Sequence, residues 1–178
     1  NKLLAKFTNA QLISASEWVR SKFEFGTSVE ILTAYSKEQL RNNPNSCVSF
    51  INQKYDFDNK ITIIEGIRNP YDFNRLFDYT RDIVVFLSRE GLVSRTSFEE
   101  NGISAIKAYT NFLLSESMLE KTRVLYIHFS SKNKYSASAI VIPNLDSLVL
   151  NDLEDAVIPL EKFISQHIPS ANGADLIS

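Results

Sequence analysis

The sequence predicts an α/β protein with three layers, in which a mainly parallel sheet carries helices on both faces. Its strand-like segments are short continuous apolar runs, which are typical of strands buried on both faces. Helical patterns separate most of these runs, as expected for parallel strands joined by crossovers. The chain has 178 residues, of which 44% are hydrophobic and 22% charged. This size and composition fit one globular domain with a substantial core.

Several boundaries are marked in the first half of the chain. Ser14 or Ser16 is expected to cap the helix after the first strand, with Glu17 completing a capping box. Pro44 should divide one helical stretch in two, and Pro70 should lie in the first turn of a later helix. The patterns predict strands at residues 10–14, 60–67 and 82–88. They predict helices at 14–23 and 69–80, two helical pieces within 36–55, and the end of a helix at 2–7.

The second half begins with a long amphipathic segment. We expect a helix within residues 96–121 that starts near Ser104. A closing helix is predicted despite Pro159, and the last residues are typical of a frayed tail. Two further strands are predicted at residues 123–129 and 138–143. The closing helix is predicted at 150–168 and the tail at 170–178.

Charge and cysteine content narrow the function classes. The formal net charge of −2 gives no global basic field, which argues against nucleic acid and anionic membranes as partners. The single cysteine, Cys47, excludes an internal disulfide and a cysteine-based zinc site, and it fits a reducing, cytoplasmic setting. No apolar run approaches the ~20 residues that span a bilayer, and no signal-peptide pattern is present.

The stretch ITIIEGIRNPYDF, residues 61–73, carries the clearest functional signal. A buried strand ends in Glu65, and Gly66 and Arg68 follow directly. Ligands of open parallel sheets bind outside the carboxyl ends of the strands, and Arg89 follows a second such end. The simpler interpretation is a strand end with a solvated turn. The functional interpretation is the floor of a phosphate site.

The order of these parts resembles the P-loop nucleotide kinases, especially their dephospho-coenzyme-A-kinase and deoxynucleotide-kinase-like branches. The matching segments are LISASEWVR, IIEGIRNPYDF, FLSREGLVSR and AIVIPNLDSL, which span almost the whole chain. The resemblance implies a single α/β domain over residues 1–178 with a lid at 89–122. It also implies ATP and Mg²⁺ as cofactors. The implied reaction is phosphoryl transfer to a nucleotide or related small phosphorylated acceptor.

The resemblance assigns a role to each matching residue. Glu65 would hold Mg²⁺ or orient the acceptor hydroxyl, and the absence of a side chain at Gly66 would let a ligand approach the backbone. The alternatives are a carboxylate that caps the turn, and a plain turn glycine. By the resemblance, the acceptor phosphate is bound by Arg20 and Arg68, the transferred phosphoryl group is neutralised by the lid residues Arg89 and Arg95, and the donor adenine is held by Asn144.

Each of these residues also has a simpler, purely structural interpretation. Arg20 could pair with Glu17 or Glu24, Arg68 could form a surface salt bridge, and Arg89 and Arg95 could belong to a charged connection. Trp18 and Tyr71 could stack on a base, although a tryptophan at helical spacing is more often part of the core. The two histidines, His128 and His167, are expected to be structural, and no metal cluster or catalytic triad has local support.

The chain departs from the family in one respect. The phosphate-binding loop Gly-x-x-x-x-Gly-Lys-Ser/Thr is absent, and no glycine precedes Gly26. The resemblance places that loop just before Asn1, so either it precedes these residues or the protein has lost it. In the second case we expect a non-catalytic pseudo-kinase module that binds a protein partner in a larger assembly.

Overall fold

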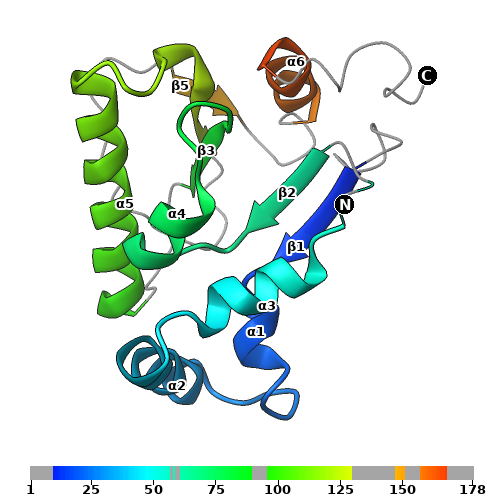
Figure 1. Cartoon of the computed structure of the whole chain (residues 1–178), viewed down its shortest axis with the longest axis vertical. Coiled ribbons are helices and arrows are strands. Elements are labelled where there is room, and N and C mark those ends of the chain that lie inside the picture. Colours follow the sequence, from blue (N-terminus) through cyan, green and yellow to red (C-terminus); the bar gives the residue numbers. More distant parts are fainter. Residues whose placement is uncertain are drawn as a thin grey trace. The chain divides into compact units, whose positions relative to one another are not determined.

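The computed structural model describes residues 10–56, 58, 61–89, 96–129, 147–150 and 157–167, which form an α/β protein (Figure 1). Every strand pair in this part of the chain is parallel. The residues cluster into two compact units. We call them the two-strand unit (Asn9–Phe77 and Thr96–Ile106) and the three-strand unit (Asp78–Arg95 and Lys107–Ser178, with Asn1–Thr8).

The two-strand unit is built on one pair of parallel strands. Strand β1 (Ala10–Ser14) pairs with β2 (Ile61–Glu65) in a register that sets Ala10 beside Ile61 and Ser14 beside Glu65. The unit also contains four complete helices and the start of a fifth. These are α1 (Ser16–Arg20), α2 (Val29–Asn42), α3 (Ser46–Lys54), α4 (Pro70–Leu76) and α5 (Ser97–Ser115).

Local chemistry explains where these helices begin. The Ser28 hydroxyl accepts the backbone N–H of Ile31 at 3.4 Å, which caps α2. Asn69 caps α4 in the same way by accepting the N–H of Asp72 at 2.9 Å, and Pro70 supplies a preset φ at the first helical position. Pro44 lies between α2 and α3, so the predicted break there is confirmed.

A buried apolar cluster lies on one face of the strand pair, while Ile61 of β2 is buried on the other face. Ile13 of β1 and Ile51 and Cys47 of α3 are buried together, and Ile64 of β2 and Trp18 of α1 pack against them. This apolar cluster anchors α1 and α3 to the strands, which places the carboxyl ends of β1 and β2 next to the start of α1.

The three-strand unit holds a second parallel sheet in the order β3-β4-β5. Leu125 and Ile127 of β4 pack against Leu160 and Phe163 of the last helix, while Lys107 of α5 lies over the rings of Phe86 and Tyr126. The new elements are β3 (Val84–Arg89), a short 3₁₀ turn η2 (Lys121–Arg123), β4 (Val124–Phe129), β5 (Ser147–Leu150) and α6 (Val157–His167).

Several sequence expectations need correction. The capping box does not form, because Ala15 occupies the cap position of α1 and the Ser14 and Ser16 hydroxyls bond to each other at 2.9 Å. Helix α5 begins at Ser97 and not near Ser104, α2 begins before the predicted residue 36, and β5 was not expected. The expected strand at 138–143, the helix end at 2–7 and the tail lie outside the described residues.

The remaining expectations concern the fold as a whole. The strand predicted at residues 10–14 is confirmed with the same bounds, and the α/β class is confirmed by helices between parallel strands. Within the described ranges, no helix combines the length and the apolar character needed to cross a bilayer.

Candidate functional site

The carboxyl ends of β1 and β2 lie side by side. Their ladder pairs Ser14 with Glu65, and the backbone N–H of Ala15 then donates to the Glu65 carbonyl at 2.9 Å. The two strands therefore end together. In a parallel sheet this edge is where ligands bind, as the sequence led us to expect.

Side-chain alternation sets the face on which these residues lie. Ile13 and Ile64 are paired in the ladder, and both contact the buried cluster. Since successive strand residues point to opposite faces, Ser14 and Glu65 share the face away from that cluster. The Ser16 hydroxyl lies 2.9 Å from that of Ser14. Two hydroxyls and one carboxylate thus gather at one strand edge.

The Glu65 carboxylate has no polar partner among the residues that the structure describes. Glu65 is exposed, and no described residue makes a hydrogen bond or ion pair with its side chain. The alternative role as a cap for the following turn is therefore not seen in the described part of the chain. Only the backbone carbonyl of Glu65 takes part in the turn, by accepting from Ala15.

The backbone conformation at position 66 requires a glycine, whereas the space around it would accept a side-chain Cβ atom. The φ of Gly66 is +80°, a value that side-chain-bearing residues rarely adopt. A Cβ placed there would lie 3.6 Å from the Ser16 nitrogen, which is an ordinary contact. The expected crowding of a ligand is therefore not needed to explain this glycine.

Arg68 makes an ion pair with the first turn of α5. Its Nη1 lies 2.6 Å from Oε1 of Glu99. The residue before it, Ile67, packs on the buried cluster, so the loop is fixed on both sides of Arg68. A Cβ on Gly102 would overlap the Arg68 carbonyl oxygen, which means that the α5 backbone lies directly against this loop. The salt bridge that the alternative interpretation expects for Arg68 is therefore present, with Glu99 as the partner.

Arg20 lies four residues after Ser16 on α1, and thus on the same face of the helix. Its alternative partner Glu17 is instead paired with Lys54 at 2.8 Å. Among the residues described, none forms a hydrogen bond or ion pair with the exposed Arg20 side chain. Within the described ranges, this guanidinium is thus exposed and has no protein partner at the end of α1.

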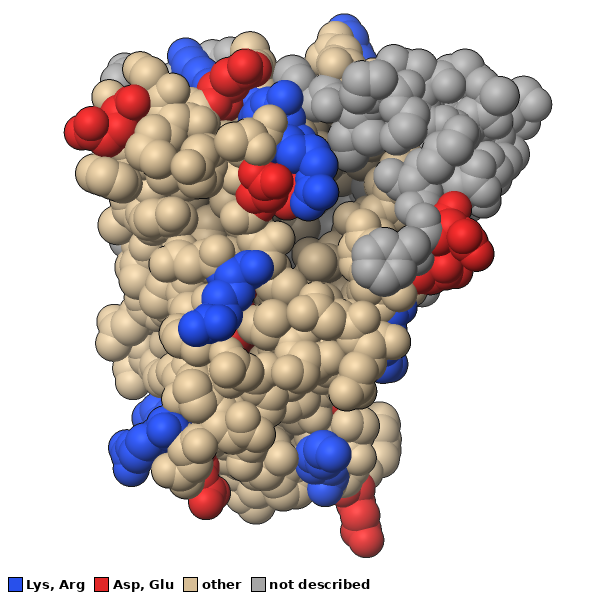
Figure 2. All heavy atoms as spheres, in the orientation of Figure 1, with Lys and Arg blue, Asp and Glu red and all other residues tan. Residues whose placement is uncertain are grey.

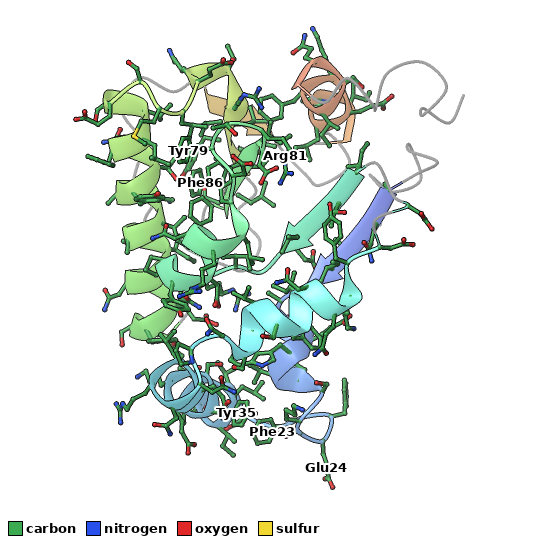
Figure 3. The ribbon with its side chains drawn as sticks, in the orientation of Figure 1. Phe23, Glu24, Tyr35, Tyr79, Arg81 and Phe86 are labelled. Atoms are coloured by element: carbon green, nitrogen blue, oxygen red, sulfur yellow. The ribbon has the colours of Figure 1, made fainter. Side chains whose placement is uncertain are left out.

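The aromatic candidates are engaged by protein groups. Trp18 packs on the core and lies 6.2 Å from the Tyr35 ring, which also meets Phe23 edge-on at 5.2 Å (Figure 3). The Tyr71 hydroxyl donates to Asn45 at 2.8 Å, and Arg75 lies over the Tyr71 ring. The packing of Trp18 agrees with the core interpretation.

The other predicted site residues cannot be placed in this site. Arg89 is the last residue of β3, but its side chain lies outside what the structure describes. Arg95 and Asn144 also lie outside the described residues, and the side chains of His128 and His167 do too. The residues that the structure brings together are Ser14, Ser16 and Glu65 at the shared end of β1 and β2.

One buried polar group was missed by sequence reasoning. Asp72 is only 4% exposed and its carboxylate accepts from the Asn69 side chain, while burial raises its pKa above the ordinary value. The Cys47 thiol lies against it, and burial followed by the Asp72 charge raises the pKa of that thiol. The signal was present in the sequence as NPYD, a helix start with an acid three residues after its asparagine cap.

The charge distribution and the donor set limit the kind of ligand. On the face shown in Figure 2, Lys and Arg lie among Asp and Glu side chains. No group of three or more His, Cys, Asp or Glu residues that could hold a metal occurs in the described part of the chain.

Comparisons with protein-family models, curated proteins and solved structures gave no match.

Proposed function

We propose that this protein is an ATP-dependent phosphotransferase of the nucleotide-kinase type, acting on a nucleotide or related small phosphorylated acceptor. The supporting observation is the exposed Glu65 carboxylate at the shared carboxyl edge of two parallel strands, where the Ser14 and Ser16 hydroxyls also lie. Phosphoryl transfer depends mainly on positioning and charge stabilisation, so acids, hydroxyls and arginines are the residue types it needs.

The oxygen donors fit magnesium. Mg²⁺ prefers hard oxygen ligands and usually keeps several waters, so one carboxylate and one hydroxyl from the protein are sufficient. Glu65 and Ser14 would hold the ion, and Ser16 would fix the Ser14 hydroxyl through the bond at 2.9 Å. When bound with ATP, the ion supplies charge neutralisation for the phosphates.

The arginines would bind the phosphates of the acceptor and of the transferred group. Arg20 and Arg68 are the proposed acceptor contacts, because a guanidinium can hold a phosphate through two parallel N–H bonds. Arg89 and Arg95 are proposed to stabilise the transferred phosphoryl group from a lid at residues 89–122. Asn144 is proposed to hold the donor adenine.

The finer fold assignment belongs to the same proposal. We infer one cytoplasmic domain over residues 1–178 with three layers and a mainly parallel sheet. Its support is the parallel pairing of every described strand. A further support is that α6 packs on Leu125 and Ile127 of β4, whereas Lys107 of α5 lies over Tyr126 of the same strand. Because successive strand residues point to opposite faces, these two contacts are on opposite faces of the three-strand sheet.

Calorimetric titration of the full chain with ATP and Mg²⁺ tests this function. Micromolar binding of ATP is expected in the presence of Mg²⁺, with strong weakening by EDTA. In a parallel titration, Arg68→Ala should weaken the binding of inorganic phosphate, which represents the acceptor group. The matched control is Arg41→Ala, which removes an exposed arginine from α2. A folded protein that takes up no ATP at millimolar concentration would overturn the proposal.

A second candidate is a non-catalytic module that binds a protein partner. Its specific support is α2, a helix of 14 residues that has no buried side chain. Val29 and Ile31 are exposed apolar residues in the first turn of this helix, and Phe25, which precedes the helix, is exposed as well. This candidate predicts that ATP and Mg²⁺ leave the melting temperature unchanged, which is the opposite of the enzyme proposal.

A further inference from the structure

The ion pair between Arg68 and Glu99 involves only one nitrogen of the guanidinium group. The Arg68 side chain is 39% exposed, whereas that of Glu99 is 19% exposed, and the one contact runs from Nη1 to Oε1. A guanidinium carries five N–H donors. In the described part of the chain no other residue bonds to the Arg68 side chain. Within the described residues, one guanidinium nitrogen is therefore held by Glu99, and the side chain as a whole remains partly exposed.

Glu99 is itself fixed in place. Its backbone N–H donates to the Thr96 hydroxyl at 3.4 Å, at the start of α5. One turn later, Gly102 brings the helix backbone against the carbonyl of Arg68, where a methyl group would overlap the oxygen. The carboxylate and the loop that carries the arginine are thus held to each other twice, once by charge and once by backbone contact.

We infer that Glu99 is a positioning residue that orients Arg68 to receive the phosphate of the acceptor. This inference rests on the proposed function. An arginine held at one nitrogen presents its remaining donors in a fixed plane, which suits bidentate contact with phosphate. An unheld arginine must lose rotamer freedom when its ligand binds, and this ordering lowers affinity.

The alternative role for Glu99 is competition, in which its carboxylate occupies the place of the phosphate. The geometry favours positioning, because the contact is single and the arginine remains more exposed than the acid. The two roles predict opposite effects of removing the charge. Positioning predicts weaker phosphate binding in Glu99→Gln, and competition predicts tighter binding.

The test follows Arg68 directly. The full chain is treated with phenylglyoxal at increasing concentrations of inorganic phosphate, and modification of Arg68 is quantified by peptide mass spectrometry. Arg41, an exposed arginine on α2, serves as the internal reference in the same digest. Phosphate should protect Arg68 and leave Arg41 unaffected.

In Glu99→Gln, the phosphate concentration for half-protection should rise roughly two- to tenfold, as expected for the loss of one preordered long side chain. Glu99→Asp should restore part of the effect, since it keeps the charge. Glu100→Gln, the exposed neighbouring acid in the same turn, should behave as wild type. A structural role alone would lower the melting temperature without moving the half-protection point.

The outcomes separate the inference from the proposed function. Protection of wild-type Arg68 that Glu99→Gln leaves unchanged or strengthens overturns the positioning role alone. Absence of ATP and Mg²⁺ binding in calorimetry overturns the proposed function. If phosphate gives Arg68 no protection in the wild type, the acceptor role of Arg68 is wrong and the inference falls with it.

Discussion

At the scale of single residues, Glu65 carries the chemistry of the proposed site. Glu65→Gln removes one charge with almost no change of shape, so Mg²⁺ would lose a ligand or the acceptor its orienting group. Turnover should fall roughly 100-fold or more, because such effects are worth a few kcal/mol and each ~1.4 kcal/mol is tenfold. The melting temperature should change little, since the side chain is exposed at a strand end.

Steady-state kinetics and thermal unfolding, measured together, check this prediction. Glu38→Gln, an exposed acid on α2, is the matched control and should leave both unchanged. A large loss of melting temperature with unchanged turnover would show that Glu65 is a structural cap.

The buried Asp72 gives a prediction for pH dependence. Burial raises the pKa of its carboxyl above the ordinary 3.8, while hydrogen bonds from Asn69 and Cys47 and the charge of Arg75 oppose that shift. A carboxyl with a raised pKa binds its proton more tightly in the folded state. Its contribution to the free energy of unfolding is therefore largest below pH 3.8, declines as pH rises through the folded pKa, and is constant above it.

Urea unfolding at a series of pH values checks this sign. Asp72→Asn should flatten the decline, because the group no longer titrates. Asp78 provides the contrast, since hydrogen bonds from Thr80 lower its pKa. Its contribution is present above the unfolded pKa and is lost as pH falls. If Asp72→Asn leaves the pH profile unchanged, the carboxyl is not the group responsible.

At the scale of elements, Gly102 determines how α5 meets the loop at residues 66–69. Gly102→Ala would place a methyl group onto the backbone carbonyl of Arg68, and backbone cannot move as cheaply as a side chain. We expect a loss of about 1–3 kcal/mol in the free energy of unfolding, although alanine is the better helix former. Urea denaturation measures it.

Asn101→Ala is the control for this prediction. It raises helix propensity at an exposed position of the same turn, so its effect should be neutral or slightly stabilising. A Gly102→Ala protein as stable as Asn101→Ala would show that α5 does not lie against the Arg68 carbonyl.

The same glycine explains how far the sequence could predict this element. A glycine inside a helix weakens the local pattern, so the sequence placed the helix start near Ser104, after Gly102. The actual start at Ser97 depends on the Thr96 cap and on packing against a loop more than 30 positions earlier. By contrast, β1 was predictable because its segment AQLIS is short and mainly apolar and follows the polar residue Asn9.

The candidate site was predictable to a similar degree. Glu65 and its strand edge followed from the rule that parallel strands end together at a ligand site. The capping box failed, because tertiary pairing determines the end of the strand and the Ala15 N–H continues the ladder to Glu65. The pairing of Arg68 with Glu99 had no local signal, since these residues meet only through the fold.

At the scale of the whole molecule, ligand binding should appear as stabilisation. If ATP and Mg²⁺ bind the folded chain alone, ATP at 100 times its dissociation constant adds about 2.7 kcal/mol to the free energy of unfolding. The melting temperature should therefore rise with ATP concentration in Mg²⁺ and fall back on addition of EDTA. Differential scanning fluorimetry measures it, with sulfate at matched ionic strength as the control. An equal rise in sulfate would indicate nonspecific anion binding.

The register of β1 and β2 has a consequence for folding fidelity. A shift of β2 by one residue would turn its side chains to the opposite face, carrying Glu65 toward Cys47 and Ile51 and Ile64 away from them. Burying an unpaired carboxylate in that apolar cluster is strongly unfavourable. The acid proposed for catalysis therefore also discriminates against misaligned strands. An apolar residue at position 65 would remove the chemistry and the penalty on misalignment together.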